Sequence, residues 1–264
     1  MSVPENKIRS LLAAGRPTVA TRLWSTWPTA VEAMAVTGNF DYFEFVAEYV
    51  PYSLADLENM VRAAELHGIG SMIKVDLQNR GYVAQRAAAS GFQAILFADH
   101  KTADEVRETI WMLSPDTLKE GRFGFPNARW IGYAPHLPQT EYAQMVRGIV
   151  KAFMIEKEEA VDNIAEICSV PGVDMVQFGP SDYSMTKGWD AGEHQSELRE
   201  AEEFVIRTAL EHGVAPRCEC HTAEKAEYYR ALGVRNFCVG DELRILNAYW
   251  KGTCGDVRAL ADAD

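Results

Sequence analysis

The sequence predicts an α/β protein that folds as a single (β/α)8 barrel, the TIM-barrel architecture, over residues 1–264. Three observations predict this fold. Eight short stretches have the composition of β-strands, helical patterns separate most of them, and a glycine precedes several of the strands. Eight strand–helix units in about 250 residues is the size of one closed barrel.

The predicted strands are spread along the whole chain. Those at 94–98 and 173–178 are nearly continuous apolar runs, as expected of parallel strands buried on both faces. The eight predicted strands are 19–24, 42–47, 71–75, 94–98, 151–156, 175–179, 214–220 and 236–240.

Helices are predicted between these strands. Residues 54–66 carry Leu54, Leu57, Val61 and Ala64 at helical spacing, and 159–167 repeat the pattern. A doubly wound open sheet is the alternative, but no Gly-x-Gly-x-x-Gly follows any strand, which removes its usual nucleotide site. Glycines suited to left-handed helix ends precede five strands, at Gly68, Gly91, Gly172, Gly213 and Gly233.

Two segments depart from the alternation. Residues 114–140 form a long loop rich in proline (115, 126, 135, 138) and aromatic residues (123, 125, 130, 133). Loops of this length are usually functional or disordered, and we expect this one to be ordered over the barrel mouth or against a neighbouring subunit. The second segment is a predicted helix at 242–250, followed by a fraying helix at 255–264. Both the aromatic loop and the 242–250 helix would supply apolar area for oligomer contacts.

Composition limits the functional classes. The chain is 47% hydrophobic and carries a net charge of −12, which disfavours nucleic acid and anionic lipid as partners. We expect no membrane segment and no leader, and therefore a cytoplasmic protein. The five cysteines are expected to be reduced thiols. The stretch Cys-Glu-Cys-His at 218–221 has no second pair at zinc spacing, so we do not predict a zinc site.

Two carboxylates stand where a barrel places its active site, at the C-terminal ends of neighbouring strands. Glu156 ends the fifth predicted strand, and Asp182 follows the sixth after Gly-Pro-Ser. Such a pair, completed by water and substrate oxygens, suits Mg²⁺ or Mn²⁺ better than zinc. The alternative is structural: Glu156 would pair with a basic side chain, and Asp182 would cap the following helix.

The surroundings of these carboxylates resemble a known family. The chain reads Ile-Glu-Lys-Glu-Glu-Ala-Val-Asp-Asn-Ile-Ala-Glu-Ile over 155–167, Gly-Val-Asp at 172–174 and Phe-Gly-Pro-Ser-Asp-Tyr-Ser at 178–184, with Gly188 beyond. This pattern is similar to the metal-binding signature of the HpcH/HpaI aldolase/citrate lyase family. Weaker likeness covers nearly the whole chain, including Trp24, Glu48, Pro51, residues 91–93 and Arg129-Trp130.

The resemblance implies a function and a site. Members of the family are (β/α)8 barrels, usually hexameric, that cleave or form 2-oxo acids through a metal-bound pyruvate enolate. By this likeness Glu156 and Asp182 are the metal ligands, and the backbone around Gly179, Pro180 and Ser181 binds the substrate carboxylate or oxyanion. It implies a metal-dependent aldolase acting on a 2-oxo acid and an aldehyde, with Trp24 and Glu48 at the substrate.

The acid–base part of the family pattern is altered. The family carries Asp-x-Glu-His-x-Pro after the second strand, whereas this chain has Val46 and Tyr49 in place of Asp and His. Lys74 replaces the family's arginine at the end of the third strand. Tyrosine is a poor base at neutral pH, with an ordinary pKa of about 10, so the usual proton relay is absent.

Other residues could replace it. His100 follows the fourth strand and His221 the seventh, and histidine is the natural proton carrier near pH 7; the alternative is a surface or supporting role for each. Tyr49 could donate to a substrate oxygen, or stack on an aromatic substrate together with Trp24. The remaining aromatic candidates for that pocket wall are Trp27 and Tyr52.

Lys74 also has two interpretations. It either neutralises the substrate carboxylate or forms a Schiff base, and the Glu156/Asp182 pair makes the imine unnecessary. The sequence therefore favours a divalent-metal-dependent carbon–carbon lyase, in which Lys74, Tyr49, His100 and His221 are the acid–base candidates. The alternatives are a 2-oxo acid decarboxylase or hydratase-type lyase on the same site, and a non-catalytic binding or assembly barrel.

Overall fold

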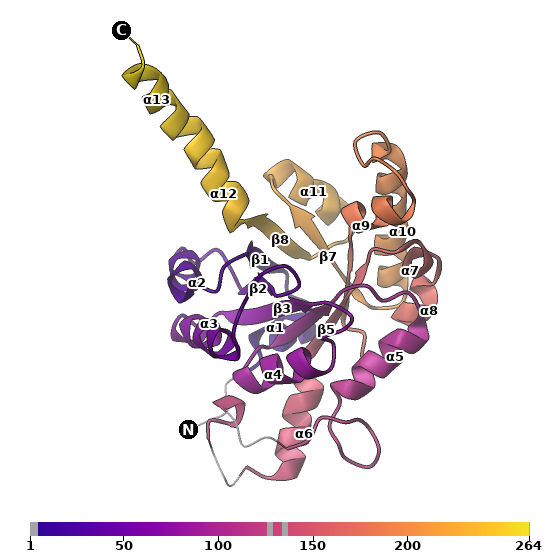
Figure 1. The fold of residues 1–264 in the computed structure, drawn as a ribbon. Helices are drawn as coiled ribbons and strands as arrows, with labels where there is room; N and C mark the ends of the chain where they lie inside the picture. Colours follow the sequence, from indigo (N-terminus) through magenta and orange to yellow (C-terminus); the bar gives the residue numbers. More distant parts are fainter. Residues whose placement is uncertain (1–4, 126–128, 134–136, 264) are drawn as a thin grey trace.

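The structure is a computed structural model that describes residues 5–125, 129–133 and 137–263. Its eight strands form one closed, all-parallel barrel in sequence order, which confirms the predicted (β/α)8 fold (Figure 1). The strands are β1 (Thr18–Leu23), β2 (Tyr42–Val46), β3 (Gly70–Val75), β4 (Ala94–Phe97), β5 (Val150–Ile155), β6 (Met175–Phe178), β7 (Ala215–Cys220) and β8 (Asn236–Asp241).

Helices surround the barrel as predicted, and α3 matches the predicted range residue for residue. The predicted helix at 159–167 is instead two short helices that meet at Asn163. The helices are α1 (Lys7–Ala13), α2 (Pro28–Ala35), α3 (Leu54–Leu66), α4 (Tyr82–Ser90), α5 (Ala103–Met112), α6 (Gln139–Gly148), α7 (Glu158–Asp162), α8 (Ile164–Cys168), α9 (Pro180–Thr186), α10 (Gln195–Glu211), α11 (Ala223–Ala231), α12 (Glu242–Tyr249) and α13 (Gly255–Ala261), with a 3-10 turn at Arg129–Ile131 and a π turn at Trp250–Cys254.

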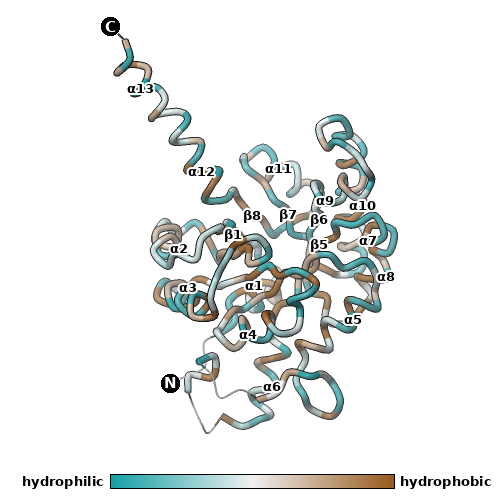
Figure 2. The backbone as a smooth tube through the Cα atoms, in the orientation of Figure 1, coloured by the Kyte–Doolittle hydropathy of each residue, from teal (hydrophilic) through white to brown (hydrophobic). Residues whose placement is uncertain are grey.

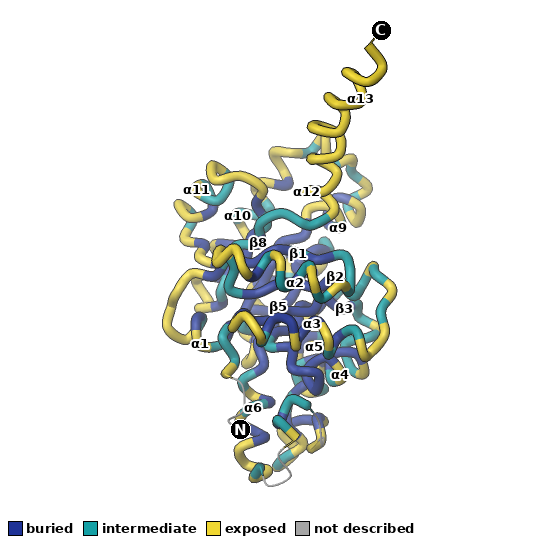
Figure 3. Tube along the Cα trace, turned by 90° about the vertical axis from the view of Figure 1, so that its left-hand side faces the viewer, coloured by how far each residue is buried: buried dark blue, intermediate teal, exposed yellow. Residues whose placement is uncertain are grey.

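The core has two layers. The larger one lies between the strands and the helices outside them, and Figure 3 shows the strands as the most deeply buried part of the chain. A smaller apolar cluster fills the inside of the barrel, where Ile8 of α1 packs with Met72 and Leu96. The five glycines predicted to end helices all have positive φ, which confirms that assignment.

Helix α1 closes the end of the barrel where the strands begin. The Asn6 side chain donates to the carbonyls of Gln93 and Gly148, which lie just before β4 and β5. Arg9 adds an ion pair of 2.6 Å to Asp174, before β6. The open mouth therefore lies at the other end, where the strands finish.

The barrel interior also holds charge. Arg217 of β7 lies 2.5 Å from the Glu44 carboxylate of β2, donates to the Tyr42 hydroxyl at 2.9 Å, and has no exposed side-chain area. Arg22 of β1 pairs with the same Glu44 at 3.0 Å. Barrel interiors are usually filled by branched apolar side chains, so a buried ion cluster of Glu44, Arg217 and Arg22 distinguishes this one.

The described part of the 114–140 segment is ordered but lies away from the mouth. Phe123 and Trp130 stack with ring centroids 6.3 Å apart, and both pack edge-on against Tyr142 of α6. Arg129 bonds the carbonyl of Ser90 at the end of α4. The expectation that this segment covers the mouth is therefore wrong, because its contacts are with helix ends on the opposite side. Pro126 and Pro135 lie outside the described residues.

The C-terminal segment projects from the molecule. Helix α12, the π turn and α13 follow one another without a break and extend away from the barrel (Figures 1 and 3). Figure 2 shows that brown, apolar positions recur along this projecting segment. None of the helices among the described residues is long and apolar enough to span a membrane. All five cysteine thiols are free, as predicted.

Candidate active site

The mouth gathers side chains from the ends of five strands, β1, β2, β3, β5 and β6. Glu156 follows β5, and Asp182 is the third residue of α9, directly after β6. Lys74 lies on β3 one residue before its end. Trp24 and Tyr49 follow β1 and β2. These residues are brought to one end of the barrel because parallel strands all finish there.

Glu156 is held on one carboxylate oxygen and crowded on the other. Its Oε1 accepts the backbone N–H of Asp99 at 3.0 Å, and its Oε2 lies 3.9 Å from the Lys74 ammonium. A Cβ on Gly179 would come within 2.6 Å of the Glu156 Cβ and 2.9 Å of Oε2. Only glycine fits at position 179 without moving the carboxylate. Burial raises the pKa of Glu156, and Lys74 only partly offsets this.

Asp182 is close enough for its charge to act on Glu156. It is one of the groups that raise the Glu156 pKa, and its own side chain is 30% exposed and 3.4 Å from the Lys157 ammonium. No cluster of three or more His, Cys, Asp or Glu side chains in metal-binding arrangement occurs within the described ranges. Glu156 and Asp182 are two hard carboxylates that could hold Mg²⁺ or Mn²⁺, with water and substrate oxygens completing the shell.

Lys74 is a permanent cation between two carboxylates. Its Nζ lies 2.6 Å from Glu48 and 3.9 Å from Glu156. Burial lowers the pKa of Lys74, but Glu156 and Glu48 together raise it above its ordinary value. A lysine that forms a Schiff base must lose its proton, so this environment disfavours the imine interpretation.

Two aromatic rings line the mouth beside Lys74. Trp24 and Tyr49 stack with centroids 5.7 Å apart, and the Tyr49 hydroxyl lies 3.5 Å from Lys74 Nζ. Burial is the main cause that raises the pKa of Tyr49, so its phenol is neutral at pH 7. The buried Trp24 Nε1 has no acceptor among the described residues. A ligand that accepts a hydrogen bond would satisfy this donor.

Comparison with known proteins agrees with this geometry. The family model for HpcH/HpaI aldolase/citrate lyase matches residues 53–240. The chain belongs to this family. The match confirms the family predicted from the sequence, and with it an enzyme of the aldolase and lyase class.

Individual members of the HpcH/HpaI family show the same extent of likeness. The hydroxypyruvate/pyruvate aldolase of Delftia acidovorans is 24% identical over 266 residues, covering 100% of this chain and 97% of that protein. The 4-hydroxy-2-oxo-heptane-1,7-dioate aldolase of Escherichia coli is 25% identical over 245 residues, covering 92% and 91%. The crystal structure of an HpcH/HpaI aldolase from Desulfitobacterium hafniense is 25% identical, with a TM-score of 0.84 and 97% of each chain covered.

The contacts recorded for the two predicted histidines are with groups other than Glu156 and Asp182. The His100 ring is buried against Phe97 and Phe153, with Nδ1 2.8 Å from the Ala98 carbonyl and Nε2 2.6 Å from the Thr109 hydroxyl. Burial lowers the pKa of His100 to about 4, so the ring is neutral. These contacts favour a structural role and make His100 a poor proton carrier.

His221 follows β7, the strand next to β6 in the barrel. Its Nε2 is 3.8 Å from Glu219 of β7, which pairs with Arg22 at 2.9 Å. About a third of the His221 side chain is exposed. Of the other aromatic candidates, Trp27 is 63% exposed and Tyr52 packs edge-on against Phe45 of the outer core. Trp24 and Tyr49 are therefore the two of these four aromatics that stack on each other beside Lys74.

Sequence reasoning missed two charged residues beside Glu156 and Asp182. Asp99 follows β4 and holds Glu156 through its N–H, while Lys157 follows β5 and lies 2.8 Å from the Asp99 carboxylate. The signal was present, because both are polar residues just beyond a strand end.

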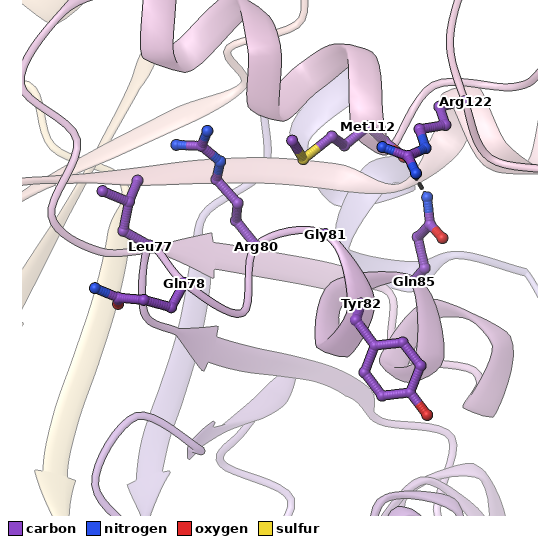
Figure 4. Close-up of a pocket in the computed structure, with 8 residues that line it drawn as sticks. All are labelled: Leu77, Gln78, Arg80, Gly81, Tyr82, Gln85, Met112 and Arg122. Carbon is purple, nitrogen blue, oxygen red and sulfur yellow. Dashed lines mark hydrogen bonds between the residues drawn. The ribbon is translucent and has the colours of Figure 1, made fainter.

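A separate cavity lies outside the mouth. It has a volume of about 450 Å³ and is shown in Figure 4, where Arg80 and Arg122 stand on opposite sides of it. Arg80 is already paired with Glu108 of α5. None of Trp24, Tyr49, Lys74, Glu156 and Asp182 lines this cavity, so its size does not make it the active site; the lining residues are Leu77, Gln78, Arg80, Gly81, Tyr82, Gln85, Met112 and Arg122.

Proposed function

We propose that this chain is a divalent-metal-dependent carbon–carbon lyase that cleaves or forms a bond between a small 2-oxo acid, such as pyruvate, and an aldehyde. The observation that carries the proposal is that the Glu156 and Asp182 carboxylates lie close enough for one charge to act on the other, beside the Lys74 ammonium. Membership of the aldolase and lyase family, and the names of its relatives, support the same chemistry.

Glu156 and Asp182 would hold the cation, which we propose to be Mg²⁺ or Mn²⁺. A bound divalent cation supplies Lewis-acid polarisation of the keto group of a 2-oxo acid. The protein's part is to fix the two ligands: the Asp99 N–H orients Glu156, and Gly179 leaves room for its carboxylate.

Lys74 would stabilise negative charge on the substrate. Its ammonium is anchored by Glu48, which holds it in place at 2.6 Å, and it stays charged throughout the working pH range. A fixed cation in a partly buried site stabilises charge that develops as the carbon–carbon bond breaks. In this arrangement Glu48 positions Lys74 and lies beside the bound substrate.

The start of α9 would bind the substrate carboxylate. Pro180 has no N–H, and the Gly179 N–H already bonds the Ile155 carbonyl at 3.1 Å. The first N–H groups of a helix have no intrahelical acceptor, which leaves Ser181 and Asp182 as the amide donors. The proposed cradle is thus narrower than the Gly-Pro-Ser backbone named from the sequence.

Trp24 and Tyr49 would form the wall against the aldehyde part of the substrate. Their stacked rings and the free Trp24 Nε1 suit a bulky or aromatic group that carries a hydrogen-bond acceptor. Tyr49 would act as a donor and not as a base, because its phenol holds its proton. His221 stays a candidate proton carrier on the β7 side of the mouth.

Metal removal tests the proposal. Protein treated with EDTA should lose carbon–carbon lyase turnover of pyruvate with a panel of aliphatic and aromatic aldehydes, and Mn²⁺ or Mg²⁺ should restore it. Borohydride added during turnover should leave no adduct on Lys74. Full activity after EDTA together with a trapped adduct would contradict the metal-dependent mechanism. Failure of the intact chain to bind Mn²⁺ in calorimetry would favour the non-catalytic barrel.

A decarboxylase or hydratase-type lyase is the second candidate. The groups close to Lys74 are Glu48, Tyr49 and Glu156, and Tyr49 stands where the family's Asp/His relay has its histidine. Loss of CO₂ from a 2-oxo acid requires an electron sink and a final proton donor, but no base to open the reaction. Product analysis distinguishes the aldolase from the decarboxylase. If the protein converts oxaloacetate to pyruvate and CO₂ faster than it consumes any aldehyde, the decarboxylase is favoured.

We also propose that the chain is a homo-oligomer, a trimer or hexamer, assembled through its C-terminal segment. Ile245 and Trp250 on this segment are 60% and 55% exposed. The outward-facing Phe237 and Val239 of β8 are only partly buried, unlike Phe97 and Phe153 of β4 and β5. A second copy of this chain would cover both surfaces. Light scattering should show an oligomer that Ile245→Glu with Trp250→Glu dissociates; an unchanged mass would overturn the proposal.

A further inference from the structure

Asp99 has a backbone conformation that non-glycine residues rarely adopt. Its φ is +67°, in the left-handed region, which is uncommon outside glycine although Asp tolerates it better than most residues. In this conformation its N–H donates to Glu156 Oε1 at 3.0 Å. The local strain is therefore tied to the position of a metal ligand.

The Asp99 side chain is engaged as well. Its carboxylate lies 2.8 Å from the Lys157 ammonium, which is only 13% exposed. The same ammonium lies 3.4 Å from Asp182 Oδ1. One lysine is thus shared by two carboxylates, and it lies closer to Asp99 than to the second metal ligand.

The shared lysine competes with a metal ion for Asp182. When the Lys157 ammonium pairs closely with Asp182, it offsets the negative charge that would bind a divalent ion, and it also repels that ion at short range. Lys157 follows Glu156 directly in the chain, so its backbone stays beside the site. Another anion can hold it aside, and Asp99 is the carboxylate nearest to it among the described residues.

We propose that Asp99 is a positioning residue for the metal site, whose N–H fixes Glu156 and whose carboxylate competes with Asp182 for the Lys157 ammonium. This inference rests on the proposed metal-dependent function. Asp99 does not contact the cation in this arrangement. It sets the affinity of the site through Glu156 and through Lys157.

Binding of Mn²⁺ to the metal-free full-length protein, measured by isothermal calorimetry, tests the inference without any assay of activity. Asp99→Asn removes the partner of Lys157, and Mn²⁺ affinity should fall about tenfold, a typical size for charged groups in contact. Asp99→Gly should behave in the same way, because it also loses the carboxylate while glycine adopts the same φ without strain. Lys157→Gln removes the competitor and should tighten binding several-fold.

The double variant decides between mechanisms. In the Lys157→Gln background, Asp99→Asn should have almost no effect on Mn²⁺ affinity, because there is no lysine left to hold. An equal loss in both backgrounds would show instead that Asp99 binds the metal itself, and would overturn the inference. The inference would also be overturned if Asp99→Asn and Asp99→Gly bound Mn²⁺ as tightly as a wild-type protein that binds it normally.

The controls separate this inference from the proposed function. Wild-type protein that binds no Mn²⁺ would refute the metal-dependent function and this inference together. Wild-type protein that binds Mn²⁺ normally, with Asp99 variants that change only the melting temperature, would refute this inference alone. Lys101→Gln, which removes an exposed ion pair to Glu159 in the same region, is the matched control and should leave Mn²⁺ affinity unchanged.

Discussion

Two buried glutamates in this barrel have opposite surroundings. Glu44, in the interior, lies between Arg217 and Arg22, and although burial alone would raise its pKa, these arginines lower it to about 2. Glu156, at the mouth, has Lys74 only at 3.9 Å, and its pKa is raised. The interior carboxylate is paired with two arginines, whereas the mouth carboxylate keeps negative charge that a bound cation would offset.

This difference distinguishes a buried glutamate with a structural role, Glu44, from one with a functional role, Glu156. Breaking a buried ion pair leaves the remaining charge without a partner and costs stability. Removing an under-neutralised buried charge has no such cost, and its loss is felt in ligand binding instead. Substitution of each glutamate by glutamine therefore distinguishes the two regions, because glutamine keeps the shape and removes the charge.

The largest effect should come from Glu156→Gln. Loss of a metal ligand removes several kcal/mol of transition-state stabilisation, so lyase turnover should fall on the order of a thousandfold or more. The urea midpoint should stay equal or rise, since a buried charge has been removed. Steady-state kinetics and urea unfolding measure the two quantities on the same preparation. Glu159→Gln, an exposed neighbour, should change neither.

Glu44→Gln should show the reverse pattern in stability. It leaves Arg217 and Arg22 without their shared carboxylate, and the free energy of unfolding should fall by about 3–5 kcal/mol, the usual cost of breaking a buried pair. Glu58→Gln, which breaks an exposed pair with Arg62, should cost below about 1 kcal/mol. Urea unfolding of both variants tests this. Equal stability of Glu44→Gln and Glu58→Gln would remove the distinction drawn here.

Acid should reveal the same contrast without substitution. A carboxyl with a lowered folded-state pKa stabilises the fold above its unfolded-state pKa, here 4.5, and this contribution is lost as pH falls toward about 2. For Glu44 the loss amounts to about 3 kcal/mol. Glu156 acts in the opposite sense, because its raised pKa makes protonation favour the fold. Unfolding of metal-free protein between pH 5 and 2 should therefore be less acid-sensitive in Glu44→Gln than in wild type.

The smallest effect concerns the wall of the mouth. Tyr49→Phe keeps the stack on Trp24 and removes the hydroxyl near Lys74, so kcat/KM should fall only about two- to tenfold, the value of one hydrogen bond. Tyr49→Ala also removes the ring and should raise KM more for aromatic aldehydes than for small ones. Equal losses for both kinds of aldehyde would argue against an aromatic wall in substrate selection.

The sequence predicted the barrel because its signals are local. Apolar strands such as β4 and β5 and the glycine at each helix end are visible one segment at a time. Glu156 and Asp182 were found because a barrel rule converts position in a strand into position in space. These assignments needed no knowledge of which side chains meet.

The features that could not be predicted from the sequence depend on contacts between residues that are distant in the chain. Nothing in the residues around Glu44 indicates that Arg217, from the other side of the barrel, lies 2.5 Å away. His100 has the type and place of a proton carrier, and only its contacts with Ala98 and Thr109 indicate a structural role. The 114–140 segment was expected over the mouth or against a neighbouring subunit, and its composition could not indicate which end of the barrel it packs on.

Helix α1 determines how this protein can be immobilised. It closes the barrel at the end opposite the mouth, where Asn6 and Arg9 tie it to the segments before β4, β5 and β6. An affinity handle fused ahead of α1 would therefore leave the mouth open to solution on a sensor chip or resin. A handle fused after α13 would lie on the surface proposed for assembly. Tethering through the N-terminal end should therefore preserve both substrate access and oligomer assembly, whereas tethering through the C-terminal end would interfere with assembly.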